Sequence, residues 1–143
     1  MLSGRWVTLA GAERDVLVVA CAVSAGIHAA LVDDHFAEGT GPGLGFGAAA
    51  VLLVAVVVGL TYRATSTLAL AAAGIVLAGL VASYVLATTT GLPLLHPDVE
   101  TVDSLALATK AVEAVGLLAA AHLLWRDRPA IARTATQPKG RTT

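Results

Sequence analysis

Four apolar runs constrain the fold of this chain more than any other feature. They lie at Val16–Val32, Leu44–Tyr62, Thr67–Ala87 and Ser104–Leu124. Each is close to the about 20 residues that a helix needs to cross roughly 30 Å of hydrocarbon. The runs lack the alternation of barrel strands, and lipid cannot hydrogen-bond to an open backbone, so we expect helices. The sequence predicts an all-α protein, a four-helix transmembrane bundle.

The composition agrees with this class, and the runs divide the chain. It is 57% hydrophobic and only 13% charged, whereas soluble domains are about 25% charged. We expect an interfacial segment over 1–15, a transmembrane domain over 16–125 and a disordered cytoplasmic tail over 126–143. The spans are predicted at about 16–34, 44–62, 66–88 and 102–125. Ser66 or Thr65 is expected to cap the third span, and Thr101 or Asp103 the fourth.

The charged residues indicate how the spans are oriented. Every Lys and Arg except Lys110 precedes the first span, follows the fourth, or lies between the second and third. The other two loops, 33–43 and 88–103, contain carboxylates and no basic residue. By the positive-inside rule, both termini are cytoplasmic, the acidic loops are outside, and the helices run up-down-up-down.

The fourth span carries a Lys and a Glu at membrane depth. Lys110 and Glu113 lie roughly 10 to 16 Å from its outer end at 1.5 Å per residue. Ionisable residues at such depth face the bundle interior and are functional candidates by default. Their three-residue spacing predicts a buried polar pair. Two interpretations stay open: the pair selects one helix arrangement, or it forms a proton or cation relay with Asp103.

Histidines and carboxylates gather at the outer end of the predicted bundle. Imidazole with carboxylate is a ligand set for zinc, copper(II) or non-haem iron. His35 and Glu38 share a helical face, and His96 and Asp98 form a compact second pair. The candidate metal ligands are His28, His35, Glu38, His96 and Asp98, with Asp33, Asp34 and Asp103 expected to support them. The alternative is that these side chains are solvated loop charges, and that His28 only hydrogen-bonds to a neighbouring helix.

A set of polar, glycine and proline residues follows a definite order along 20–120. It contains His28, His35-Phe-Ala-Glu38, the glycines that start the second span, Arg63, the run Thr-Gly-Leu-Pro at 90–93, Glu100, Asp103 and Glu113. This order resembles a family of uncharacterised four-span membrane proteins common in high-GC Gram-positive bacteria. The chain departs from it at Asp33-Asp34, where the family pattern has a Pro before the second His, and at Lys110.

The resemblance implies no established activity, and it implies that the outer polar cluster acts as one unit. We therefore expect a multi-pass protein of the bacterial cytoplasmic (inner) membrane that binds a divalent metal ion outside. The alternatives are proton or cation translocation through Asp103, Lys110 and Glu113, and a structural or accessory role.

The expected partners are the lipid bilayer and either further copies of the chain or a larger membrane complex, with no nucleic acid. An enzyme is less favoured, because the sequence shows no Ser/His/Asp order and no redox Cys pair.

Overall fold

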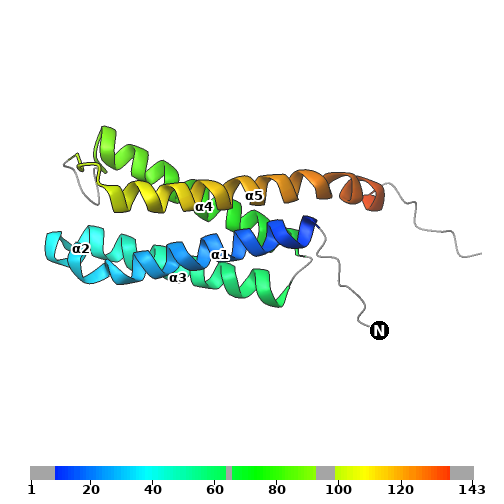
Figure 1. The fold of residues 1–143 in the computed structure, drawn as a ribbon, viewed down its shortest axis with the longest axis horizontal. Coiled ribbons are helices and arrows are strands. Elements are labelled where there is room, and N and C mark those ends of the chain that lie inside the picture. Colours follow the sequence, from blue (N-terminus) through cyan, green and yellow to red (C-terminus); the bar gives the residue numbers. More distant parts are fainter. Residues whose placement is uncertain (1–8, 64–65, 93–98, 136–143) are drawn as a thin grey trace, which may run out of the picture.

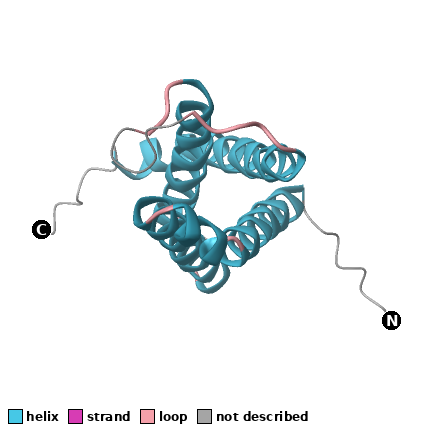
Figure 2. Cartoon of the chain, turned by 90° about the vertical axis from the view of Figure 1, so that its left-hand side faces the viewer, coloured by secondary structure: helices cyan, strands magenta, loops and turns pink. Residues whose placement is uncertain are grey.

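The computed structural model describes residues 9–63, 66–92 and 99–135, and over these residues the chain is helical. Its elements are α1 (Leu9–Ala30), α2 (Val32–Glu38), α3 (Thr40–Tyr62), α4 (Thr67–Thr89) and α5 (Ser104–Ala135). Figure 1 shows α1 and α3 side by side, with α4 and α5 above them. Seen end-on, the long helices surround one common axis (Figure 2).

Three helices are long and apolar enough to cross a membrane: Thr40–Tyr62, Thr67–Thr89 and Ser104–Asp127. The bent pair Gly11–Ala30 and Val32–Glu38 makes a fourth if it counts as one span. The expectation of four candidate spans therefore holds only when α1 and α2 are joined across their bend. The structure supports a membrane protein with three to four transmembrane helices.

The first predicted span is bent rather than straight. The axis turns by 46° between α1 and α2. Backbone hydrogen bonding continues through the bend, since the Leu31 amide donates to Ile27 and the carbonyl of Leu31 accepts from His35. The ring of Phe36 then lies directly against the Cα of Gly43 in α3, where a side chain would clash with it. This contact holds α2 against the start of α3.

The glycine-rich segment 39–47 corrects one expectation. The second span is expected from about residue 44, but α3 begins at Thr40 and only Gly39 separates it from α2. The helical hydrogen bonds begin at once, since the Gly43 amide donates to the Gly39 carbonyl over 3.2 Å. The glycines at 43, 45 and 47 therefore belong to the first turns of a helix.

The remaining helix ends follow side-chain chemistry. The hydroxyl of Ser66 accepts from the Ala69 amide and caps α4, and the Asp103 carboxylate accepts from the Ala106 amide and caps α5. At the other end of α4, Gly91 has a φ of 72°, the left-handed conformation that glycine adopts readily after a helix. Helix α5 continues to Ala135, so the segment from 126 begins as helix and not as the expected tail. Residues 136–143 lie outside the described residues.

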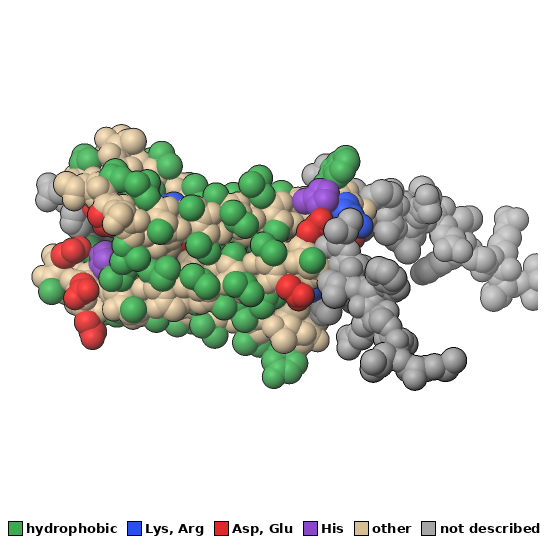
Figure 3. All heavy atoms as spheres, viewed as in Figure 1, with side chains coloured by type: hydrophobic (Ala, Val, Ile, Leu, Met, Phe, Trp, Pro, Cys, Tyr) green, Lys and Arg blue, Asp and Glu red, His purple; other side chains and the backbone are tan. Residues whose placement is uncertain are grey.

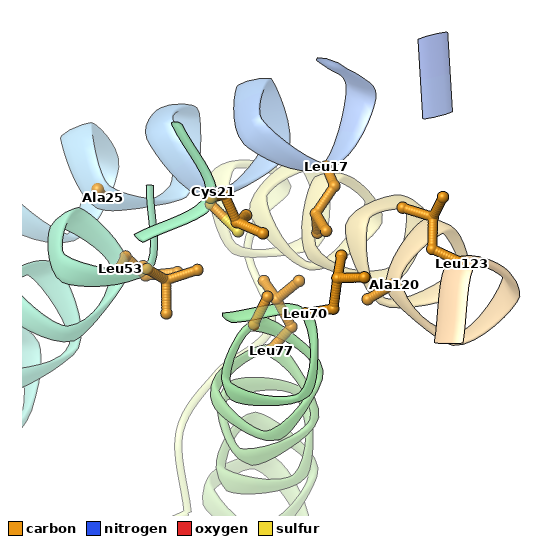
Figure 4. Close-up of a cluster of buried hydrophobic side chains, with 11 residues drawn as sticks. Leu17, Cys21, Ala25, Leu53, Leu70, Leu77, Ala120 and Leu123 are labelled. Atoms are coloured by element: carbon orange, nitrogen blue, oxygen red, sulfur yellow. The ribbon is translucent and has the colours of Figure 1, made fainter. Parts of the chain in front are cut away.

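One half of the bundle has an apolar core. Figure 4 shows Leu17 of α1, Leu70 and Leu77 of α4 and Ala120 of α5 pointing toward one another. Close approach of α1 and α5 needs Gly116, because a Cβ there would lie 2.9 Å from the Cβ of Ala20 and 3.1 Å from Leu77. Small residues at such crossings are how helices pack in lipid, where no hydrophobic force drives them together.

The outer surface is apolar between two polar ends. Figure 3 shows hydrophobic side chains over the middle of the molecule and charged side chains at its two ends. We call the end that carries Asp34, Glu38, Glu100 and Asp103 the acidic end, and the end that carries Arg14, Arg63 and Arg126 the basic end. An apolar belt of this size is what lipid-facing helices present, and soluble proteins rarely expose so large a patch.

Candidate ligand-binding site

A pocket of about 590 Å³ opens at the acidic end, between α1 and α2 on one side and α4 and α5 on the other. Its polar lining residues are His28, Asp34, His35, Glu38, Ser83, Tyr84, Glu100, Thr101, Asp103, Thr109 and Lys110. Apolar side chains, among them Ile27, Leu31 and Phe46, complete the wall. The pocket therefore combines a concave shape with converging polar groups, which is the usual form of a ligand site.

His35 is held in one orientation by two contacts. Its Nδ1 lies 2.8 Å from the carbonyl oxygen of Leu31, and its ring stacks on Phe46 with centroids 3.5 Å apart. A carbonyl oxygen can only accept, so Nδ1 carries the hydrogen. In the neutral ring the lone pair is then on Nε2. This is the arrangement in which histidines commonly ligate metal ions.

His28, seven residues earlier in the chain, is held in the same way. Its Nδ1–H donates to the carbonyl of Ser24 over 2.9 Å, with the Ser24 hydroxyl 3.3 Å away. Its ring lies 5.1 Å from Phe46 by centroids, and only 7% of its side chain is exposed. The Nε2 atom faces Glu113, with Oε1 at 4.0 Å. Both histidines line the pocket, and His28 turns its Nε2 atom toward the buried Glu113 carboxylate.

The inner end of the pocket is a buried polar network. Glu113 is 0% exposed. Its Oε1 accepts from the Ser24 hydroxyl over 2.8 Å, and its Oε2 accepts from Lys110 Nζ over 2.7 Å. The Lys110 ammonium also lies 3.5 Å from the Leu80 carbonyl and 5.6 Å from the centre of the Tyr84 ring. The network joins α1, α4 and α5, and both oxygens of the buried carboxylate are satisfied.

Carboxylates surround the mouth of the pocket. Asp34 and Glu38 come from α2, and Glu100 and Asp103 come from the approach to α5. The side chain of Asp33 is exposed and does not line the pocket. The mouth therefore carries more negative charge than Lys110 can balance, which favours a cationic ligand.

The structure brings some of the predicted ligands together and leaves others untested. His28, His35 and Glu38 line one pocket, with Asp34 and Asp103 beside them. His96 and Asp98 lie outside the described residues. Within the parts of the chain that are described, no three His, Cys, Asp or Glu side chains form a ready-made group for a metal ion. The described candidate ligands thus lie on two walls of one pocket, but their side chains are too far apart to bind one metal ion together.

Several members of the site, among them Ser24, Tyr84 and Phe46, were not singled out as site residues from sequence. Ser24 and Tyr84 have no distinctive spacing of their own, although Ser24 lies four residues before His28 and so shares its helical face. Phe46 carries a weak signal: the chain has only two Phe residues, one in α2 and the other in the first turns of α3. The contact of Ser24 with Glu113 joins residues 89 positions apart in the chain, so only the folded chain reveals it.

The basic end is built differently. The Arg14 guanidinium donates to the carbonyls of Leu60 and Arg63, over 3.1 and 3.3 Å, and so covers the end of α3. Glu13 Oε2 lies 3.2 Å from His122 Nδ1 and 3.5 Å from the Arg126 guanidinium. These contacts join α1 to the end of α3 and to α5, and none of these residues lines the pocket at the acidic end.

Comparisons of the chain with protein-family models, with curated proteins and with solved structures find no match.

Proposed function

We propose that the chain is a multi-pass protein of a bacterial cytoplasmic membrane whose acidic-end pocket binds a divalent transition-metal ion on the outer side. The topology rests on the charges: Arg14, Arg63 and Arg126 lie at one end of the helices, and basic residues collect on the cytoplasmic side of membrane proteins. With α1 and α2 taken as one bent span, four spans then run up-down-up-down and both termini are cytoplasmic.

One observation carries the metal proposal. His28 and His35 both donate Nδ1–H to a backbone carbonyl four residues earlier. The neutral ring of each then has its lone pair on Nε2, and both side chains line a pocket whose mouth carries carboxylates. Imidazole with carboxylate suits zinc, copper(II) and iron(II), while magnesium and calcium prefer oxygen ligands alone. The ligand set favours a transition metal over those two ions.

Binding would join the two walls of the pocket. On one wall His35 stands between Asp34 and Glu38, and on the other Glu100 and Asp103 approach from α5. Since no three of these groups are assembled in the described residues, the ion would gather them by side-chain rotation. Such a site binds and releases its ion more readily than a closed structural zinc site, which suits reversible capture.

Metal titration of the purified protein tests the proposal. In detergent at neutral pH, we expect one equivalent of Zn²⁺ per chain by elemental analysis after desalting, and a measurable affinity by calorimetry. His35→Ala should weaken binding by about tenfold or more, the loss typical of a removed metal-site partner. His122→Ala is the matched control, because this histidine is at the basic end.

A second pair of variants tests the position of the ion. Asp34→Asn should weaken zinc binding, whereas Asp33→Asn, one residue away but facing out of the pocket, should not. Absence of stoichiometric zinc, copper and iron in the wild-type protein would refute the metal proposal. Equal effects of the two aspartate variants would move the ion out of this pocket.

Translocation through Asp103, Lys110 and Glu113 has less support. Beyond Glu113, toward the basic end, the centre of the bundle is filled by buried Leu17, Leu70 and Leu77. A proton or ion would need polar groups or water across that region, so no observation on the described residues favours this alternative.

A further inference from the structure

Two electron-rich atoms face each other at the inner end of the pocket. His28 Nε2 and Glu113 Oε1 are 4.0 Å apart. Each is fixed from behind, His28 by the Ser24 carbonyl and Glu113 by the Ser24 hydroxyl. Both side chains are more than nine-tenths buried. In the neutral form of the ring, His28 Nε2 and Glu113 Oε1 both present lone pairs to the space between them, and a cation is the species that both attract.

A cation is already present beside them, covalently tethered to α5. The Lys110 ammonium reaches the other oxygen of Glu113 and lies near a backbone carbonyl and the face of Tyr84. A carboxylate, a carbonyl oxygen and an aromatic face are the groups that bind a free ammonium ion. Lys110 is 17% exposed, at the boundary between the pocket and the buried network.

We propose that Glu113, Ser24 and His28 form an inner cation site, and that the Lys110 ammonium, held on the second oxygen of Glu113, keeps other cations out of it. Lys110 neutralises Glu113 and repels a divalent ion that would otherwise reach His28 Nε2. It thereby confines an incoming metal ion to the outer tier of the pocket, at His35 and the carboxylates of the mouth. This inference rests on the proposed metal binding for the role of the outer tier, but not for the existence of the inner site.

Removing the charge of Lys110 opens the inner site. Lys110→Leu keeps the bulk of the aliphatic stem and leaves Glu113 Oε2 free for a metal ion. We expect this variant to bind a second equivalent of Zn²⁺, or to bind zinc at least about tenfold more tightly, a change that calorimetry resolves easily. Lys110→Arg keeps the charge and should bind zinc as the wild type does.

A double variant identifies the ligands of the added site. Lys110→Leu/Glu113→Gln lacks both charges, so it should lose the gain and return to the wild-type stoichiometry. Lys110→Leu/His35→Ala should keep the inner ion, because His35 belongs to the outer tier. A Lys110→Leu protein with wild-type stoichiometry and affinity would overturn the proposal, as would a gain that survives Glu113→Gln.

Thermal unfolding keeps the test decisive if Lys110→Leu is unstable. The buried Glu113 carboxylate then has lost its counter-ion, and zinc should raise the melting temperature of this variant more than that of the wild type or of Lys110→Leu/Glu113→Gln. If zinc does not recover a folded Lys110→Leu protein while the double variant folds, Lys110 is only a positioning residue for Glu113 and the inference is wrong.

The outcomes separate the two proposals. Zinc binding by Lys110→Leu but not by the wild type would refute the proposed function and keep the inner site. Zinc binding by the wild type that depends on His35, with no gain in Lys110→Leu, would refute the inner site and keep the proposed function.

Discussion

The two halves of the bundle use the same helices in opposite ways. Toward the basic end, α1, α4 and α5 meet through Leu17, Leu77 and Ala120, all fully or almost fully buried. About two to three turns further along α1, the inward-facing polar side chains are Ser24 and His28, and they meet Glu113 of a buried ion pair instead of leucines. The contacts of α1 with α5 thus change from apolar to polar along the same helix.

The two halves contribute differently to the fold: one packs the helices closely, and the other selects how they are arranged. Lipid tails are as apolar as leucine, so the apolar half gains from close contact and little from exclusion of water. The polar half gains from hydrogen bonds that only one helix arrangement can satisfy, because an unpaired Glu113 or Lys110 would be very costly inside a membrane. The apolar half, toward the basic end, thus contributes close packing. The polar half, toward the acidic end, selects one arrangement of the helices and borders the pocket.

The largest effect is expected from breaking the buried pair. Glu113→Ala leaves the Lys110 ammonium without its carboxylate and the Ser24 hydroxyl without its acceptor, and it should reduce the free energy of unfolding by about 3–5 kcal/mol. Reversible unfolding of the detergent-solubilised protein by SDS measures this loss.

The matched control removes both charges. Lys110→Leu/Glu113→Leu should recover most of the stability, since replacing a buried pair by apolar residues is often neutral or stabilising. If Glu113→Ala lowers the free energy of unfolding no more than a substitution of an exposed residue does, the polar half does not specify the arrangement of the helices.

A smaller effect is expected in the apolar half. Gly116→Ala places a Cβ 2.9 Å from that of Ala20, so α1 and α5 must separate, at a cost of about 1–3 kcal/mol. Gly79→Ala is the control, because nothing lies within 4 Å of a Cβ there. SDS unfolding should show the loss for the first variant only. Zinc affinity should stay unchanged in both, and a large change would mean that the two halves are coupled.

The smallest effect on stability is expected at the docking of α2. Gly43→Ala displaces the Phe36 ring, which is already 44% exposed and can rotate outward, so the unfolding free energy should fall by about 1 kcal/mol or less. His35 lies on α2, however, so a change in the tilt of this helix moves the imidazole. Zinc affinity should therefore fall by about fivefold, the equivalent of about 1 kcal/mol. Gly45→Ala meets no atom within 4 Å and should bind as the wild type; equal affinities for both variants would contradict the role assigned to Phe36.

Local features of the fold were predictable because they depend on neighbours in the chain. Long apolar runs become helices in any lipid environment, and the caps at Ser66 and Asp103 depend on amides three residues away. The pairing of Lys110 with Glu113 follows from their spacing on one helix. The bend between α1 and α2 and the start of α3 at Thr40 were not predicted, because the sequence pattern does not show how α2 packs on α3, where Phe36 meets Gly43.

The sequence by itself determined that the chain is helical and apolar enough for a membrane, that its charges are divided between two ends, and that one helix carries a buried charge pair. These properties follow from composition and from spacings of one turn or less. Only the tertiary structure decided that Ser24 reaches Glu113, that His28 faces the same carboxylate, and that His35 shares their pocket. Those contacts join α1 or α2 to α5 across the bundle, and in lipid their positions are set by helix packing and by the need to satisfy buried polar groups.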